Sequence, residues 1–291
     1  MLRKIAYVAP AAVMAVSLTG CMGIGDSDKG SSGGDNGGGV ALSAAQVMSK
    51  AANNTASADS YKIAMRMTMV GKMGGQQRSV HFAGDGQYRV KPSLAMAFTF
   101  DKMDMGGGQQ LPGGMETRVV GRAMFIKAPM LQKVTGGKPW VKFSFDQLGK
   151  RSGMNFDQLV QRAQHQADPA TYTKMFTASK DVKEVGNQTV RGVKTTHYTG
   201  TVDMTKALSQ IDGKQRKYMK SQLSSLRNVK FDLFSDSKQL PRKIVLHGTA
   251  KSMKYSTTAY YSDFGQPVHI AAPPAAQTTD GSKLGKQLGA H

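Results

Sequence analysis

The chain has 291 residues and a formal net charge of +20, from 39 lysines and arginines against 19 aspartates and glutamates. An excess of this size favours anionic partners, such as nucleic acid or anionic lipid surfaces, and says nothing about the fold. Hydrophobic residues make up 40% of the chain, which is enough for a buried core. The single cysteine excludes an internal disulfide and a paired-cysteine metal or redox site.

The first twenty residues have the pattern of an export signal. Two basic residues precede an apolar run of about a dozen residues, which is too short to span a bilayer. The run ends in the letters LTGC, which resemble the lipobox of bacterial lipoproteins, where the cysteine thiol is acylated and the signal is cut before it. We therefore expect residues 1–20 to be a lipoprotein signal peptide and Cys21 to carry the lipid. The alternative is an ordinary cleaved signal with an accidental cysteine.

Two segments that are poor in packing residues flank one continuous domain. Residues 21–40 are rich in Gly, Ser and Asp and are expected to form a flexible tether, with a mean reach of about 20–25 Å. Residues 275–291 are expected to be a disordered C-terminal tail. The domain between them spans residues 41–274.

The first half of this domain opens with a short helix and continues as strands. Ser43 and Gln46 fit a capping box in front of that helix. The stretch "YKIAMRMTMV" then alternates apolar and polar residues with period two, as expected of a strand with one apolar face. Turn residues separate further strands at hairpin spacing. The expected strands are 61–70, 79–90, 93–105, 115–121, 122–129 and 139–145.

The second half mixes helices with more strands. An apolar stripe predicts a helix over 155–164, and Asp168 followed by Pro169 is typical of the start of a second helix. Asp203 is expected to cap a helical region that extends to residue 228. The remaining strands are expected at 181–192, 193–203, 229–236, 240–250 and 253–264. No βαβ repeat occurs, which argues against a parallel sheet.

The sequence thus predicts an α+β fold with a large, curved antiparallel sheet of about 10–11 strands. Helices are expected to cover one face, because a sheet of this size cannot leave its apolar face in water. The curvature is expected to give a half-barrel wrapped around those helices.

The sequence contains no catalytic motif in a suitable structural context. We therefore expect no enzyme, no metal site and no cofactor. Residues 30–34 spell G-x-S-x-G, but they lie in the tether, without the strand and helix that a nucleophile elbow needs. The six histidines are scattered, and two glutamates in the whole chain leave no room for a paired-glutamate site.

Methionine and aromatic residues recur on the apolar sides of the expected strands. Methionine deforms around irregular ligands at low cost, and a sheet that curls toward closure can enclose an apolar molecule. The alternative is ordinary core between sheet and helices. The candidate cavity residues are Met65, Met67, Met69, Met96, Phe98, Phe100, Met124 and Phe125.

Basic residues gather in the helical region that follows Asp203. A solvated helix face is the plainer interpretation, and attraction to an anionic membrane surface is the sharper one. Nucleic acid is not expected, because the export signal argues against it and stacking aromatics are missing there. The candidate anionic-surface contacts are Lys214, Arg216, Lys217 and Lys220.

Two stretches resemble a known family. The first is "DPATYTKMFTASKDVKEVGNQTVRGVKTTHYTGTVD" over residues 168–203, and the second is "YYSDFGQPVHIAAPP" over residues 260–274. With the lipobox, they resemble the LppX/LprG-like actinobacterial lipoproteins, whose fold is like that of the LolA/LolB carriers.

This resemblance implies a half-barrel sheet around helices and an apolar cavity that holds acyl chains of a lipid or lipoglycan, for transport across the cell envelope. It implies no catalytic residues. We therefore expect a monomer, lipid-anchored on the extracytoplasmic face of the cell membrane, with a lipid ligand, an anionic membrane surface and an envelope transport protein as partners. The alternative is a non-carrier interaction or sensory lipoprotein with a filled core.

Overall fold

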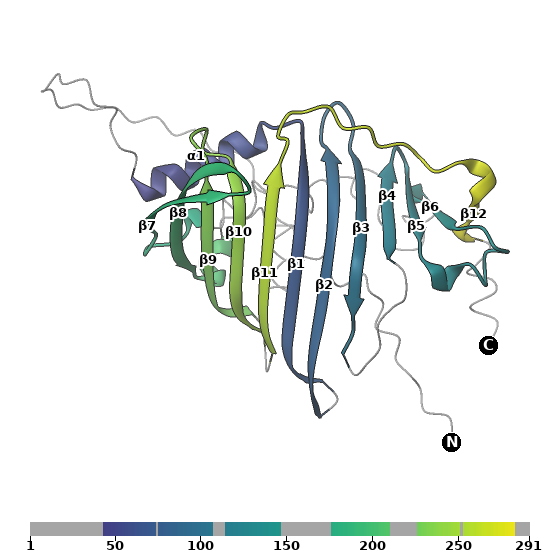
Figure 1. Ribbon diagram of the computed structural model, residues 1–291, viewed down its shortest axis with the longest axis horizontal. Helices are drawn as coiled ribbons and strands as arrows, with labels where there is room; N and C mark the ends of the chain where they lie inside the picture. The colour runs from purple at the N-terminus through teal and green to yellow at the C-terminus, as the bar shows by residue number, and fades with distance from the viewer. Residues whose placement is uncertain are drawn as a thin grey trace, which may run out of the picture.

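A computed structural model describes residues 43–73, 75–106, 114–146, 176–209, 226–250 and 253–282. Strands account for most of these residues (Figure 1). The elements are α1 (Ala44–Ala56), β1 (Ser60–Met73), β2 (Gln76–Arg89), β3 (Ala95–Asp104), β4 (Met115–Val120), β5 (Ala123–Lys127), the 3-10 turn η2 (Pro129–Leu131), β6 (Trp140–Ser144), β7 (Lys183–Val190), β8 (Val193–Val202), α5 (Met204–Ser209), β9 (Leu226–Ser235), β10 (Pro241–Ala250), β11 (Met253–Ser262), η3 (Ala275–Gln277) and β12 (Thr278–Asp280).

Twelve strands form one open sheet in the order β12-β6-β5-β4-β3-β2-β1-β11-β10-β9-β8-β7. All neighbours are antiparallel except β12, which runs parallel to β6. The first strand, β1, lies at the middle and pairs with β11, the last long strand, so the two halves of the chain join there (Figure 1). The sheet is not closed, and the expected large antiparallel sheet is confirmed.

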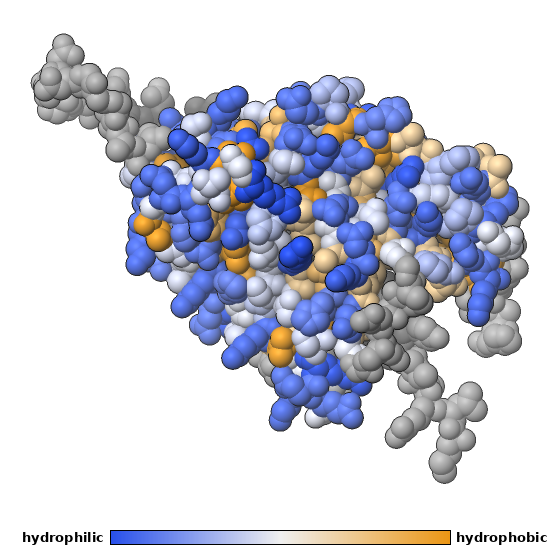
Figure 2. All heavy atoms as spheres, in the orientation of Figure 1, coloured by the Kyte–Doolittle hydropathy of each residue, from blue (hydrophilic) through white to orange (hydrophobic). Residues whose placement is uncertain are grey.

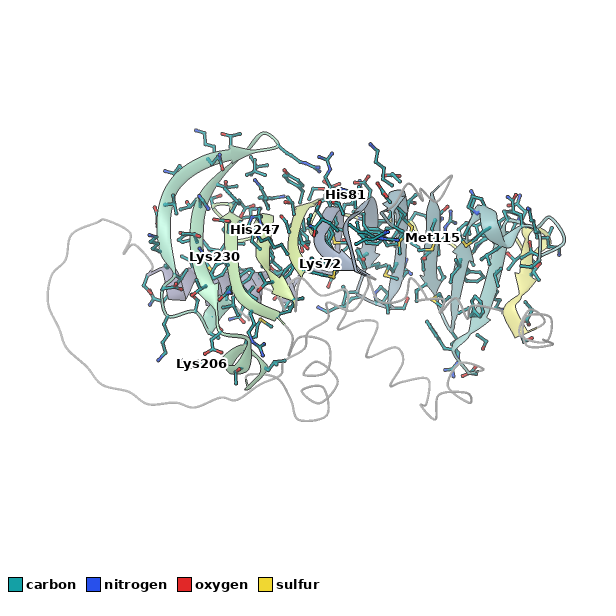
Figure 3. All side chains as sticks on the ribbon, turned by 90° about the horizontal axis from the view of Figure 1, so that it is seen from below. Lys72, His81, Met115, Lys206, Lys230 and His247 are labelled. Carbon is teal, nitrogen blue, oxygen red and sulfur yellow. The ribbon has the colours of Figure 1, made fainter. Side chains whose placement is uncertain are left out.

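Alternation along each strand separates two faces of the sheet. In β1, Met65, Met67 and Met69 pack against the main apolar core, whereas the intervening Arg66 is exposed. We call the face that carries these methionines the inner face and the opposite one the outer face. Lys206 of α5 lies below the strands and His81 of β2 above them (Figure 3), and the outer face is largely hydrophilic (Figure 2).

Both described helices begin as the sequence predicts and pack on the inner face. Ser43 and Gln46 form a reciprocal capping box at α1. Asp203 accepts hydrogen bonds from the backbone amides of Thr205 (2.9 Å) and Lys206 (3.2 Å) at the start of α5. These bonds lower the pKa of the Asp203 carboxyl, because they favour its charged form. Apolar residues of both helices belong to the same core cluster as the inner face.

Two expectations for the C-terminal end need correction. A disordered tail from residue 275 is wrong for residues 275–282, because Thr278–Asp280 pairs with Trp140–Lys142 as β12. This short strand also raises the count above the 10–11 expected. Three residues are too few for a period-two pattern to show, so the sequence gives no signal for this strand.

Candidate ligand-binding face

The inner face is apolar across the four central strands. The sheet register aligns Met67 with Phe82 of β2 and with Thr257 of β11, and Met65 with Gly84 and Ala259. On β3 the same face carries Met96, Phe98 and Phe100. From the level of Tyr61 to that of Met69, the register places no charged side chain on this face of β11, β1, β2 and β3. Such a surface offers hydroxyl groups but no charge, and it suits a ligand whose contacting part is apolar.

The structure brings seven of the eight predicted cavity residues into one cluster. Met96, Phe98 and Phe100 are buried, and Phe98 and Phe100 contact each other with ring centroids 4.7 Å apart. The other four are only partly buried and pack against this cluster. These four are Met65, Met67, Met69 and Met124. The partly exposed methionines, and not the buried phenylalanines, therefore have surface left to contact a ligand.

Phe125 is the exception, and its assignment to the same wall is wrong. It follows Met124 on β5, so alternation turns the two side chains to opposite faces. Phe125 packs on the outer face with Ala123 and Trp140 in a separate small cluster. Arg118 covers this cluster, with its guanidinium 4.8 Å from the Trp140 ring and a hydrogen bond to the Ala271 carbonyl (3.2 Å). Phe125 is thus part of the packing beneath the C-terminal segment.

A glycine on the inner face of β2 has a role that the sequence analysis missed. Gly86 aligns with Phe98 of β3, and the Phe98 ring lies across the glycine. A Cβ atom at residue 86 would stand 2.4 Å from Phe98 Cδ2 and 3.1 Å from the Ala97 carbonyl oxygen. The same arrangement recurs where Phe231 lies over Gly200. A glycine within an alternating strand often marks a close approach of this kind, and it is the sequence signal from which the role of Gly86 could be predicted.

Replacing Gly86 with alanine should therefore destabilise the protein through overpacking. We expect a loss of about 1–3 kcal/mol and a Tm lower by about 2–12 °C, measured by differential scanning calorimetry. Gly86→Ala in a Phe98→Ala background should cost clearly less, because the clashing ring is gone. An equal loss in both backgrounds would show that Phe98 is not the cause.

Three tyrosines on the inner face have pKa values raised by burial. Burial raises the pKa of the Tyr255 hydroxyl to about 12 and raises that of Tyr88 above its ordinary range. The pKa of Tyr198 on β8 is also raised, first by burial and then by the negative charge of Glu184. Desolvation disfavours the charged phenolate, so these hydroxyls stay neutral near neutral pH.

One cleft in the described part of the chain lies away from this face. It has a volume of about 710 Å³ and lies between the β7–β8 turn, the β9–β10 turn and the segment that follows β11. Its walls are mainly polar, with Lys194, Lys238 and Arg242 among them. Segments from three parts of the sequence build it, so no local pattern could have predicted it. A cavity on the inner face itself stays a prediction.

Other predicted site residues lie outside the described residues. These are Cys21 and the basic set Lys214, Arg216, Lys217 and Lys220. The helix expected over 155–164 also lies outside, as do Asp168 and Pro169. Among the residues that are described, no helix has the length and hydropathy to cross a membrane. In the same part of the chain, no group of three or more His, Cys, Asp or Glu side chains is placed to hold a metal.

His197 takes part in a row of contacts on the outer face. Its ring stacks on Phe234 with centroids 4.2 Å apart, and its Nε2 atom lies 2.8 Å from Asp232 Oδ1. Across the next strands, the Lys243 ammonium stands 4.6 Å from the Phe234 ring. Arg191 at the tip of the β7–β8 hairpin covers the Tyr260 ring at 4.1 Å. These contacts hold the hairpin across the front of β9 and β10 (Figure 1).

No family model matches the chain. Two curated proteins from Streptomyces do. One, from Streptomyces griseus, is described as "Uncharacterized 31.2 kDa protein in rplA-rplJ intergenic region" and is 35% identical over 161 residues, which are 54% of this chain and 52% of that protein. The other, from Streptomyces coelicolor, is described as "Putative lipoprotein SCO4650" and is 31% identical over 153 residues, which are 51% of this chain and 45% of that protein. The matches thus span about half the length of the curated relatives.

Solved structures decide the fold. The crystal structure of LprF from Mycobacterium bovis matches 80% of this chain and 97% of its own, with a TM-score of 0.51 and 13% identity. This chain has the fold of LprF. Lipoprotein LppX from Mycobacterium tuberculosis also matches, with a TM-score of 0.45 and 16% identity over 78% of this chain and 98% of its own. The resemblance to LppX/LprG-like lipoproteins is therefore confirmed at the level of the LprF fold, while function requires its own argument.

Proposed function

We propose that this protein is a membrane-anchored extracytoplasmic lipoprotein that binds the acyl chains of a lipid or lipoglycan against its inner face, for transport across the cell envelope. The observation that carries the proposal is the row of partly exposed methionines on β1, set in the uncharged stretch of the inner face over β11, β1, β2 and β3. A relative from Streptomyces coelicolor is described as a "Putative lipoprotein", which supports this class of protein. The chemical class of the ligand is inferred from the inner face alone.

Methionine is the side chain best suited to such a surface. Met65, Met67 and Met69 have unbranched, polarizable side chains that repack around an irregular chain at low cost. Each methylene of a ligand that leaves water contributes about 0.8 kcal/mol. An acyl chain laid along β1 would contact successive inner-face residues about 7 Å apart, which is twice the rise per residue of a strand. The long β1 therefore offers a track rather than a point of contact.

The same contacts also favour an alternative. Met96, Phe98 and Phe100 are already buried by the protein itself. If the methionines of β1 were covered in the same way, the domain would have a filled core, and an envelope interaction or sensory role would follow. The partial exposure of those methionines is what favours the carrier.

The experiment that tests the proposal is lipid analysis of the full chain. The protein is purified from membranes of a host that lipidates it, and also as a secreted form without acylation. We expect native mass spectrometry of the secreted form to show a co-purified lipid, and a fluorescent fatty-acyl probe to bind saturably after delipidation. If no lipid co-purifies and the probe does not bind saturably, the carrier proposal is rejected and the filled-core alternative remains.

A further inference from the structure

The polar cleft at the end of the sheet carries an inference that is independent of the apolar face. Its volume of about 710 Å³ lies within the range of about 300–1,000 Å³ that is usual for small-molecule sites. It opens between three turns, beside the hairpin that Arg191 holds over the outer face. A bare phosphate or chloride ion would occupy only a small part of this space.

The wall made by the β9–β10 turn is fixed in place. The buried Asp236 carboxylate accepts hydrogen bonds from the backbone amides of Lys238 and Leu240, both at 2.9 Å. It also accepts from Arg242 Nε at 2.8 Å and pairs with the second arm of that guanidinium at 2.7 Å. The guanidinium lies 5.7 Å from the Phe264 ring, which belongs to the opposite wall. The cleft is thus preorganised, and Arg242 is already engaged.

The cleft is lined by more positive than unpaired negative side chains. Of its two carboxylates, Asp236 is paired with Arg242, and Asp263 is paired with Lys62 at 2.8 Å. Lys194 and Lys238 also line the cleft, and neither forms an ion pair within the described part of the chain. Lys194 of β8 and Lys238 of the β9–β10 turn therefore line one cleft without a resident counter-charge.

Neutral polar side chains complete the lining. Ser237 and Gln266 contribute a hydroxyl and an amide to the walls. Lysine binds phosphate as a compact point charge with three donors. Hydroxyl and amide groups exchange hydrogen bonds with the hydroxyls of a polyol. The two kinds of group together match a ligand that has one anionic end and one hydroxylated end.

We propose that this cleft binds the phosphate ester of a polyol, such as glycerol phosphate or a sugar phosphate, with the phosphate between Lys194 and Lys238 and the hydroxyls toward Ser237 and Gln266. The ester can come from a soluble metabolite or from the headgroup of a lipid. The shared chemistry is the same, and the test separates the two sources.

The experiment is isothermal titration of the purified full-length protein with three probes. These are glycerol 1-phosphate, glucose 6-phosphate, and dihexanoyl phosphatidylglycerol below its micellar concentration. We expect saturable binding that weakens as salt rises, and a loss of at least about tenfold in Lys194→Glu/Lys238→Glu. The matched control is Lys230→Glu/Lys254→Glu, which makes the same charge change at exposed strand positions away from the cleft and should lose less than about twofold.

Each outcome bears on the proposal. Binding of the soluble esters supports a metabolite site, and binding of the short-chain lipid without them supports a headgroup site. No binding of any probe overturns the proposal, and so does an equal loss in both double variants, which would indicate general charge attraction. Lys194→Gln/Lys238→Gln covers the case in which the reversal does not fold, and it should also lose binding. Because the acyl probe tests the inner face, its failure would leave this site standing.

Discussion

Replacing Met67 with lysine should lower the affinity for an acyl probe by about 10- to 100-fold. Met67 lies at the middle of the apolar track on β1, between Phe82 of β2 and Thr257 of β11. A buried methionine side chain is worth about 1.5–3 kcal/mol, and each 1.4 kcal/mol is about tenfold in affinity. A lysine there must keep its ammonium hydrated, so it holds water where the acyl chain would lie. Titration of a fluorescent fatty-acyl probe measures the change.

The matched control is the next residue along the strand. Thr68 faces the opposite side of the sheet, where its hydroxyl lies 3.1 Å from His81 Nδ1. Thr68→Lys adds the same charge one position away and should leave probe affinity within about twofold, because the outer face is already solvated. Met67→Leu conserves volume and polarity and should retain binding. Equal losses in the two lysine variants would show that the inner face is not the binding surface.

That pair of variants rests on the part of the fold that the sequence predicts best. Alternation in "YKIAMRMTMV" assigns Met67 and Thr68 to opposite faces, and the structure agrees. Capping chemistry at Ser43 and Asp203 likewise fixes where α1 and α5 begin. These features are local: a pleat has period two, and a cap needs a carboxylate or hydroxyl within three residues.

Non-local features are a different matter. Nothing in β1 or β11 shows that they pair, although that pairing joins the two halves of the sheet. Met124 and Phe125 are both apolar, so composition alone groups them, but as neighbours on β5 they lie on opposite faces of the sheet. The polar cleft depends on an Asp236–Arg242 pair that only the β9–β10 turn makes visible. Contacts between distant segments follow from the fold, and no spacing of residues along the sequence predicts them.

Replacing Cys21 with alanine, behind an export signal that is cleaved without acylation, should move the protein from the membrane to the soluble fraction. Our proposal makes this thiol the site of acylation, and stable anchoring needs two or more acyl chains, each worth about 0.8 kcal/mol per buried methylene. The effect should approach all-or-none in detergent phase partitioning followed by immunoblotting, and intact mass should show the loss of the lipid.

The control is Met22→Ala, which changes the residue next to Cys21 without removing the thiol. This variant should stay in the detergent phase. Probe binding by the secreted Cys21→Ala form should equal that of the acylated protein, because the flexible tether that we propose for residues 21–40 would separate the anchor from the sheet. If Cys21→Ala partitions like the wild type after signal cleavage, the cysteine is not the anchor. The basic set Lys214, Arg216, Lys217 and Lys220 then becomes the candidate for membrane attachment. Salt would then release the protein, because polybasic attraction is screened within a Debye length whereas acyl insertion is not.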